Sequence, residues 1–206
     1  MTDDIDVAAF RHAAYAIAHD NNAPATVTAY AGAVAAARHR AQLEGTTLAC
    51  QLIAELSTDP VTHAAAVEVG PFTMLTLSDW LTEVWDAVTE LAAVTEVPEL
   101  SADERMYRRA TTELFAETDA SASTATLAFA AALAVAHVRW LAGGVVAEAT
   151  TVTSVLEGDP VAAVARAELD ESTRASIAMA VGNRWREIME RVQVMEMVSA
   201  IEAAVA

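Results

Sequence analysis

Apolar residues recur at spacings of three and four along most of the chain, which places them on one face of an α-helix. Few segments alternate apolar and polar residues, so the pattern predicts no strand. It predicts ten helices and an all-α fold class. The expected helices are 4–19, 25–44, 46–56, 60–69 and 77–95 in the first half, and 102–118, 124–142, 145–156, 160–169 and 173–204 in the second.

Local signals mark several of these helix ends. Asp59-Pro60 and Asp159-Pro160 each supply an N-cap residue followed by proline at the first helical position. Ser101, followed three residues later by Glu104, predicts a capping box. Gly70, followed by proline, is expected to end the helix that Asp59 begins.

One phrase occurs twice. Residues 59–68 read "DPVTHAAAVE" and residues 159–168 read "DPVAAVARAE", with Asp, Pro, Val, Ala and Glu at the same five places. We therefore expect a tandem duplication, with one repeat at 1–98 and the other at 99–206. The match extends at an offset of 100 through Leu77–Ile177, Leu81–Val181, Trp85–Trp185 and Val88–Ile188, and at an offset of 99 through Tyr30–Phe129, Val34–Leu133, Arg40–Arg139 and Gly45–Gly144; Tyr15 is paired with Phe115 near the start.

Composition adds a strong negative charge to this picture. The formal net charge is −17, lysine is absent, and all twelve basic residues are arginine. A halophilic source or a GC-rich genome would each account for this bias, and both remain open. The charge opposes nonspecific binding to nucleic acid at low salt, although molar salt screens such repulsion beyond about 3 Å.

The chain is expected to fold in the cytoplasm. Cys50 is the one cysteine, so an internal disulfide and a cysteine-based zinc site are both excluded. The N-terminus is acidic and does not resemble a signal peptide. Residues 124–144 are apolar and almost long enough to span a membrane, but they include His137 and Arg139. An arginine at the centre of a span costs about 2.5–3.5 kcal/mol, so a buried helix and no membrane association are predicted.

Two tandem five-helix repeats of about 100 residues resemble the cyclin fold. The segment 162–192, "AAVARAELDESTRASIAMAVGNRWREIMERV", is similar to the closing helix-turn-helix in the core of archaeal transcription initiation factor B, a TFIIB-like protein. The segment 46–69, "TTLACQLIAELSTDPVTHAAAVEV", resembles that family's small-residue third helix and its fourth helix. The resemblance implies promoter DNA or a TATA-binding-protein-like factor as a partner.

The chain also departs from this family. A single cysteine cannot form the family's zinc ribbon, and the linker that reaches into RNA polymerase has no counterpart. The segment between Ala165 and Trp185 is several residues longer than the family pattern, and Gly182 stands where the family often has arginine. These departures predict an accessory or regulatory protein rather than a general initiation factor.

The resemblance assigns DNA binding to the closing segment, where four of the twelve arginines lie between residues 174 and 191. A helix-turn-helix contacts DNA through its second helix and flanking phosphate contacts. An alternative is a solvated face with Arg186–Glu190 and Glu187–Arg191 pairs. A second basic cluster, Arg105, Arg108 and Arg109, could form an anion site or an exposed helix face in which Glu104–Arg108 and Arg109–Glu113 have ion-pair spacing. The candidate DNA-binding residues are Arg174, Asn183, Arg184, Arg186 and Arg191.

The last predicted helix continues beyond the repeat with an apolar stripe. This stripe could pack on the first repeat, or it could dock a protein partner or a second copy of the chain. The second use leads to an alternative function, an all-helical interaction or assembly protein with no nucleic-acid role. Methionines in this segment would suit an adaptable docking face. The candidate docking residues are Met195, Val198, Ile201 and Val205.

No pattern in the chain predicts catalysis, a metal site or a cofactor. His12 and His19 lie seven residues apart, about 10.5 Å along a helix, which is too far to share one ion. No glycine-rich phosphate loop or nucleophile elbow occurs. The chain is therefore predicted to be non-enzymatic.

Overall fold

The computed structural model describes residues 2–97, 100–119, 121–143 and 148–205, and every regular element in these ranges is an α-helix. The all-α prediction is confirmed. The described helices are α1 (Thr2–Asp20), α2 (Ala25–Glu44), α3 (Leu48–Thr58), α4 (Pro60–Glu83), α5 (Trp85–Ala92), α6 (Ala102–Thr118), α7 (Thr124–Gly143), α8 (Glu148–Gly158), α9 (Pro160–Glu168), α10 (Glu171–Asn183) and α11 (Trp185–Val205).

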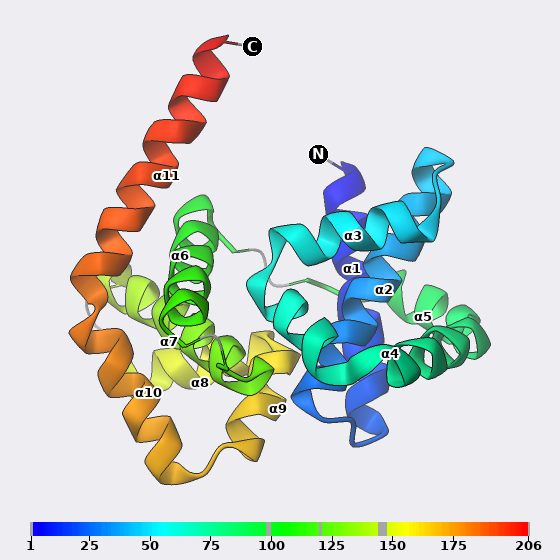
Figure 1. Cartoon of the computed structure of the whole chain (residues 1–206), viewed down its shortest axis with the longest axis horizontal. Helices are drawn as coiled ribbons and strands as arrows, with labels where there is room; N and C mark the ends of the chain where they lie inside the picture. The colour runs from blue at the N-terminus through cyan, green and yellow to red at the C-terminus, as the bar shows by residue number, and fades with distance from the viewer. Residues whose placement is uncertain (1, 98–99, 120, 144–147, 206) are drawn as a thin grey trace.

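The helices form two groups that lie side by side, α1–α5 and α6–α11 (Figure 1). In the first group α2 packs against α1, α3 and α4; in the second, α7 packs against α6, α8, α9 and α10. Both central helices are rich in alanine and buried along most of their length. Small side chains allow neighbouring helices to approach on several sides, so each group is built around one alanine-rich helix.

The third helix of the first half is not the helix at the centre of its group. The resemblance likens this element to a small-residue third helix. In the structure that element, α3, leaves Leu48 and Ile53 exposed, and only Gln51 and Glu55 are buried in it. The reason is length and composition. Helix α3 has 11 residues and includes the polar side chains of Gln51, Glu55 and Ser57, whereas α2 has 20 residues with mostly small side chains.

The predicted caps are confirmed. The Asp59 carboxylate accepts from the amide of Val61, and the Asp159 carboxylate accepts from the amide of Ala162. Ser101 and Glu104 form the reciprocal hydrogen bonds of a capping box at the start of α6. These helix ends follow from short-range chemistry, which explains why the sequence alone located them.

Two glycines adopt the left-handed conformations that the turns require. Gly70 has φ 72° and ψ 162° and divides α4 into two helical segments, and Gly45 has φ 65° at the C-cap of α2. The corresponding Gly144 lies outside the described residues.

Two helices that the periodicity predicted as continuous are broken. The predicted helix 77–95 breaks at Val84, with φ −96° and ψ 8°, and the predicted helix 173–204 breaks at Arg184, with φ −100° and ψ 9°. In both places the residue after the break is a tryptophan. The apolar stripe runs through each break without a change of spacing, so periodicity could not reveal it.

The tryptophan rings explain the direction that the chain takes after each break. Each ring packs between an aromatic residue of the first helix of its group and a side chain of the second. These contacts join segments distant in sequence. They are Phe10–Trp85 (5.3 Å between centroids), Arg38–Trp85 (4.3 Å from the guanidinium carbon to the centroid), Tyr107–Trp185 (5.2 Å) and His137–Trp185 (4.3 Å).

Similar contacts occur on the first helix of each group. Phe10 packs on Trp85 and Tyr107 packs on Trp185, while Arg11 lies 3.9 Å from Asp59 and Arg108 lies 3.7 Å from Asp159. These contacts relate residues 97 positions apart, whereas the sequence pattern pairs Tyr15 with Phe115 at an offset of 100. The tandem duplication stays a prediction.

The last residue of the repeated phrase joins the two groups. The Glu68 carboxylate accepts a hydrogen bond from the amide of Thr124, the first residue of α7, at 2.5 Å. The Glu168 carboxylate accepts from the amide of Ala25, the first residue of α2, at 2.8 Å. A carboxylate near a helix N-terminus satisfies a free backbone donor and complements the helix dipole. Each group therefore caps the central helix of the other.

Helix α7 is long and apolar enough to span a membrane by length and composition alone, with a mean hydropathy of 1.5. More than half of it is buried among the other helices. Its central position in the second group accounts for this apolar composition.

Candidate functional site

The predicted DNA-binding residues lie along α10 and α11 but do not form one basic surface. Arg184 donates hydrogen bonds to Glu187 and to the Thr118 hydroxyl, and Arg191 binds the Glu117 carboxylate through both terminal nitrogens. Both arginines therefore tie the start of α11 to the end of α6. The predicted Glu187–Arg191 pair is wrong, because Arg191 reaches across to α6 instead.

Of the remaining three predicted residues, Arg186 and Asn183 are exposed and Arg174 is half-buried. Arg186 has an 87% exposed side chain and lies 3.9 Å from Glu190, the pair that its spacing predicted. Arg174 donates to the backbone carbonyl of Arg166 at 3.5 Å, and Asn183 is exposed at the end of α10.

The N-terminus of α10 is negatively charged, although a DNA-reading helix would approach the duplex with this end. Asp170 caps it by accepting from the amide of Thr173, and Glu171 lies in the first turn. Hydrogen bonds from the backbone amide and from the hydroxyl of Thr173 hold the pKa of Asp170 below its ordinary value. This carboxylate therefore stays ionised at neutral pH and opposes a phosphate at the helix end.

The apolar stripe of α11 divides into a buried and an exposed part. Ile188 and Val192 are buried, and Met195 is partly buried against the core. Beyond them α11 extends away from the other helices (Figure 1). Val198 and Ile201 are 48% and 58% exposed, while the side chain of Val205 lies outside the described residues. The alternative in which the stripe packs on the first repeat does not hold for the described residues, since α11 packs mainly against α6 of its own group and its last turns are exposed.

Three further residues of the same helix are exposed, Met189, Val194 and Met197. The two methionines are among those expected to suit a docking face, whereas Val194 was not predicted. We refer to Val194, Met197, Val198 and Ile201 as the α11 apolar face. Periodicity could not separate this face from the buried stripe, since both are apolar. The signal that indicates it is the length of α11, which has 21 residues, whereas α5, the other helix that begins at a tryptophan, has eight.

A groove of about 700 Å³ lies between α6 and the α11 apolar face. Four carboxylates and two guanidinium groups line it, for a net charge of −2: Glu113, Glu187, Glu190 and Glu202 against Arg109 and Arg191. Val194, Met195 and Val198 provide its apolar wall. The groove therefore combines an apolar surface with negative charge.

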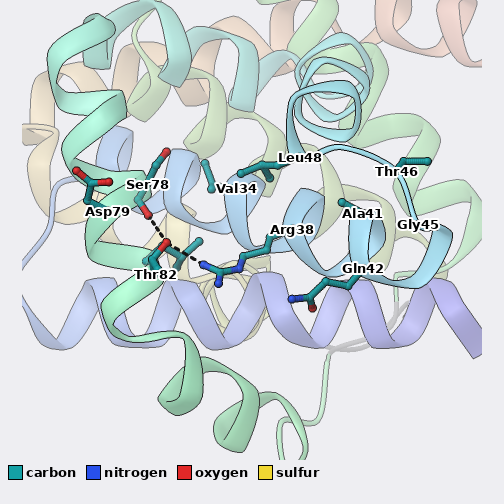
Figure 2. A pocket seen from close by; sticks show the side chains of 11 residues that line it. Val34, Arg38, Ala41, Gln42, Gly45, Thr46, Leu48, Ser78, Asp79 and Thr82 are labelled. Atoms are coloured by element: carbon teal, nitrogen blue, oxygen red, sulfur yellow. Dashed lines mark hydrogen bonds between the residues drawn. The ribbon is translucent and has the colours of Figure 1, made fainter.

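A second groove, of about 580 Å³, lies between α2 and the second segment of α4 (Figure 2). Arg38 donates to the Thr82 hydroxyl at 3.0 Å, and Thr82 in turn donates to the carbonyl of Ser78 at 2.9 Å. The Arg38 guanidinium also covers the Trp85 ring. The Arg38 guanidinium, the one cation that lines the groove, is therefore used to hold the helices together. Asp79 is the one acid that lines it.

Among the described residues, no group of three or more His, Cys, Asp or Glu side chains could hold a metal ion. Cys50 is exposed. Comparison of the chain with protein-family models, with curated proteins and with solved structures found no match. Its function must therefore be inferred from its own surfaces.

Proposed function

We propose that the chain is a non-enzymatic interaction protein built from two cyclin-like helical repeats, and that the α11 apolar face docks a protein partner. The duplication is supported by contacts that occur in both halves: the broken helix before each tryptophan, the Arg–Asp pairs, and the caps from Glu68 and Glu168. The observation that carries the function is the exposure of the α11 apolar face on a helix that extends from the fold.

The charge around this face favours a basic partner. The groove beside it has a net charge of −2, and the whole chain has −17. A second copy would bring carboxylates against carboxylates, whereas an amphipathic helix with arginine or lysine beside its apolar residues would pair with them. Met195 and Met197 can adapt their conformations to such a helix. The proposed partner is therefore a basic amphipathic helix of another protein.

Exposed apolar side chains also occur elsewhere, including Val67, Phe72 and Leu75 on α4. The α11 apolar face differs from them because its four residues lie on one uninterrupted helix, whereas the break at Gly70 separates Val67 from Phe72 and Leu75. Leu75 is 69% exposed and Ile201 is 58% exposed, so they make a matched pair for substitution.

The test is the binding of a fluorescein-labelled amphipathic peptide of leucine and lysine, followed by anisotropy in KCl buffer. We expect Ile201→Glu to weaken binding roughly tenfold or more, as expected for a central interface residue, and Leu75→Glu to leave it unchanged. Equal effects of the two substitutions would overturn the proposal. A dimer of the unliganded protein in light scattering, dissolved by Ile201→Glu, would instead assign the face to a second copy.

The alternative is a transcription-factor-B-like accessory protein that binds DNA or a TATA-binding-protein-like factor. The exposure of Arg186 favours it, since this side chain remains accessible to a phosphate. A mobility-shift assay on promoter duplex in molar KCl distinguishes the two functions. If the protein shifts the duplex, and this shift is lost in Arg186→Ala but still seen in Arg109→Ala, DNA binding is favoured over the docking of a basic helix.

A further inference from the structure

A cavity of about 300 Å³ lies where the two helix groups meet. Helix α1 contributes one wall, and α6, α7 and α8 contribute the others. Three guanidinium groups and a single carboxylate line it. The polar lining residues are Arg11, His12, Tyr15, Arg108, Arg139, Ser154 and Asp159.

The charge of this cavity is opposite to that of the protein. Three arginines and one aspartate give its lining a net charge of +2. The four other grooves carry 0, −2, −3 and +1, counted in the same way from their lining residues, and the +1 comes from Arg139, which lines this cavity as well. In a chain of net charge −17, this cavity is where an anion would find a favourable surface.

Two of the three arginines are already neutralised by carboxylates outside the lining. Arg11 forms an ion pair with Glu55, and Arg139 donates two hydrogen bonds to Glu104, at 2.6 and 3.3 Å. These contacts hold both side chains in place, so they give the wall a fixed shape.

Arg108 is different. Sequence spacing predicted that it would pair with Glu104 on the surface of α6, but Glu104 binds Arg139. Among the described residues its closest acid is Asp159, at 3.7 Å, and its side chain donates no hydrogen bond to any of them. The side chain is 29% exposed and lines the cavity. A guanidinium group has five N–H donors, and a half-buried one without hydrogen bonds is costly unless a ligand accepts from it.

Neighbouring groups can complete the recognition of an oxyanion. Burial raises the pKa of Tyr15, so its hydroxyl is protonated and can donate. Burial also lowers the pKa of His12, an effect that Asp159 opposes and that Arg11 and Arg108 reinforce, so its imidazole is neutral at pH 7 and can donate through one nitrogen. An arginine, a phenol and an imidazole thus surround one small space.

The rest of the lining is apolar. Leu100, Ala132, Val135 and Val155 contribute hydrocarbon surface. A ligand with a short hydrocarbon body and one acidic group matches this combination. The Asp159 carboxylate lies in the same wall and would repel a second negative charge, so a monoanion is favoured over a dianion.

We propose that this cavity binds a small organic monocarboxylate, with the carboxylate held by Arg108. A planar guanidinium group matches a carboxylate through two parallel hydrogen bonds, which gives both affinity and orientation. The exposed Ser154 lies at the rim, where the ligand would enter.

The test uses potassium butyrate as the probe, against KCl at equal ionic strength, with thermal unfolding and titration calorimetry as measurements. At about ten times its Kd, butyrate should raise the Tm by about 3–6 °C for a chain of this size. Potassium phosphate should raise it less. Arg108→Gln should abolish the butyrate effect, whereas Arg109→Gln, one residue along α6 on the exposed face, should retain it.

Ser154→Trp provides a second variant that preserves every charge of the cavity. It changes an exposed residue, so the Tm in KCl should stay near that of the unmodified protein, while the indole blocks entry and butyrate loses its effect. An equal rise in Tm for the unmodified protein, Arg108→Gln and Ser154→Trp would overturn the proposal, because it would show a general ion effect. No calorimetric binding of butyrate to the unmodified protein would overturn it as well.

Discussion

The Glu68 carboxylate accepts a hydrogen bond from the backbone amide of Thr124, at the first residue of the central helix in the opposite group. It also accepts from the hydroxyl of Thr26 at 2.7 Å. Glu168 makes the equivalent contact with Ala25. Both glutamates end the phrase that occurs twice in the sequence, so the repeated phrase contributes a cap for its own helix and a cap for the opposite group.

Replacement of these glutamates should weaken the attachment of the two groups. We expect Glu68→Ala and Glu168→Ala each to lower the free energy of unfolding by about 1 kcal/mol, as for the loss of a helix N-cap, with the larger loss for Glu68 because it has two donors. Urea unfolding measures this. Glu90→Ala, at an exposed position, is the control. If Glu68→Ala and Glu168→Ala lower the free energy of unfolding no more than Glu90→Ala does, the proposed role of the caps is contradicted.

A second prediction concerns the approach of α1 to α2. A β-carbon on Gly32 would lie 2.0 Å from a ring carbon of Tyr15, which is buried. Alanine favours a helix over glycine by about 1 kcal/mol, but overpacking a core costs about 1–3 kcal/mol. We expect Gly32→Ala to destabilise the protein by about 1–2 kcal/mol, measured by urea unfolding.

A double substitution tests the cause of this effect. With Tyr15→Ala already present, the added methyl group meets no ring, so Gly32→Ala should no longer destabilise and should restore part of the stability. Additive losses in the double variant would show that the Tyr15 ring is not what excludes a side chain at residue 32.

A third prediction concerns the carboxylate of Glu55, whose side chain is 3% exposed. It binds Arg11 on α1 and Arg40 on α2, the latter at 2.9 Å. Removing one partner of a buried ion pair leaves the other charge uncompensated, which costs about 3–5 kcal/mol. We expect a loss of this size for Glu55→Gln in urea unfolding. Glu113→Gln breaks the more exposed pair with Arg109 and should cost less than about 1 kcal/mol.

A fourth prediction concerns acid stability. Burial lowers the pKa of His12 in the folded protein, and of the charged groups that face it, Asp159 opposes this shift while Arg11 and Arg108 reinforce it. The unfolded chain therefore binds the proton more tightly than the folded chain. The contribution of His12 is complete above the ordinary histidine pKa of about 6.5 and is lost as the pH falls below it.

The unfolding free energy, measured by urea at a series of pH values from neutral to weakly acidic, should decrease as the pH falls. His12→Gln should reduce this slope, while His63→Gln, at an exposed position, should not. An unchanged slope in His12→Gln would contradict the assigned role of burial.

Much of the helical structure could be predicted from the sequence because its causes are local. The caps at Asp59, Asp159 and Ser101 depend on hydrogen bonds between residues two or three positions apart, and Gly70 breaks a helix through its own backbone conformation. The breaks at Val84 and Arg184 escaped prediction, since the tryptophan rings that follow them pack on helices distant in sequence.

The candidate surfaces depended far more on tertiary structure. Periodicity identified an apolar C-terminal helix, but the packing of α6 along its first turns decides which residues are buried and which form the α11 apolar face. Spacing paired Arg108 with Glu104, and Arg139 from another helix displaced it.

Composition, caps and periodicity act over a few residues, and they were enough to show that the chain is helical and acidic and contains one phrase twice. Packing between helices fixes which arginines bind acids of other helices, and it leaves Arg108 facing a cavity with no hydrogen bond to a described residue. Long arginine side chains choose among carboxylates from several helices, and that choice depends on distances in space that no spacing along the chain contains.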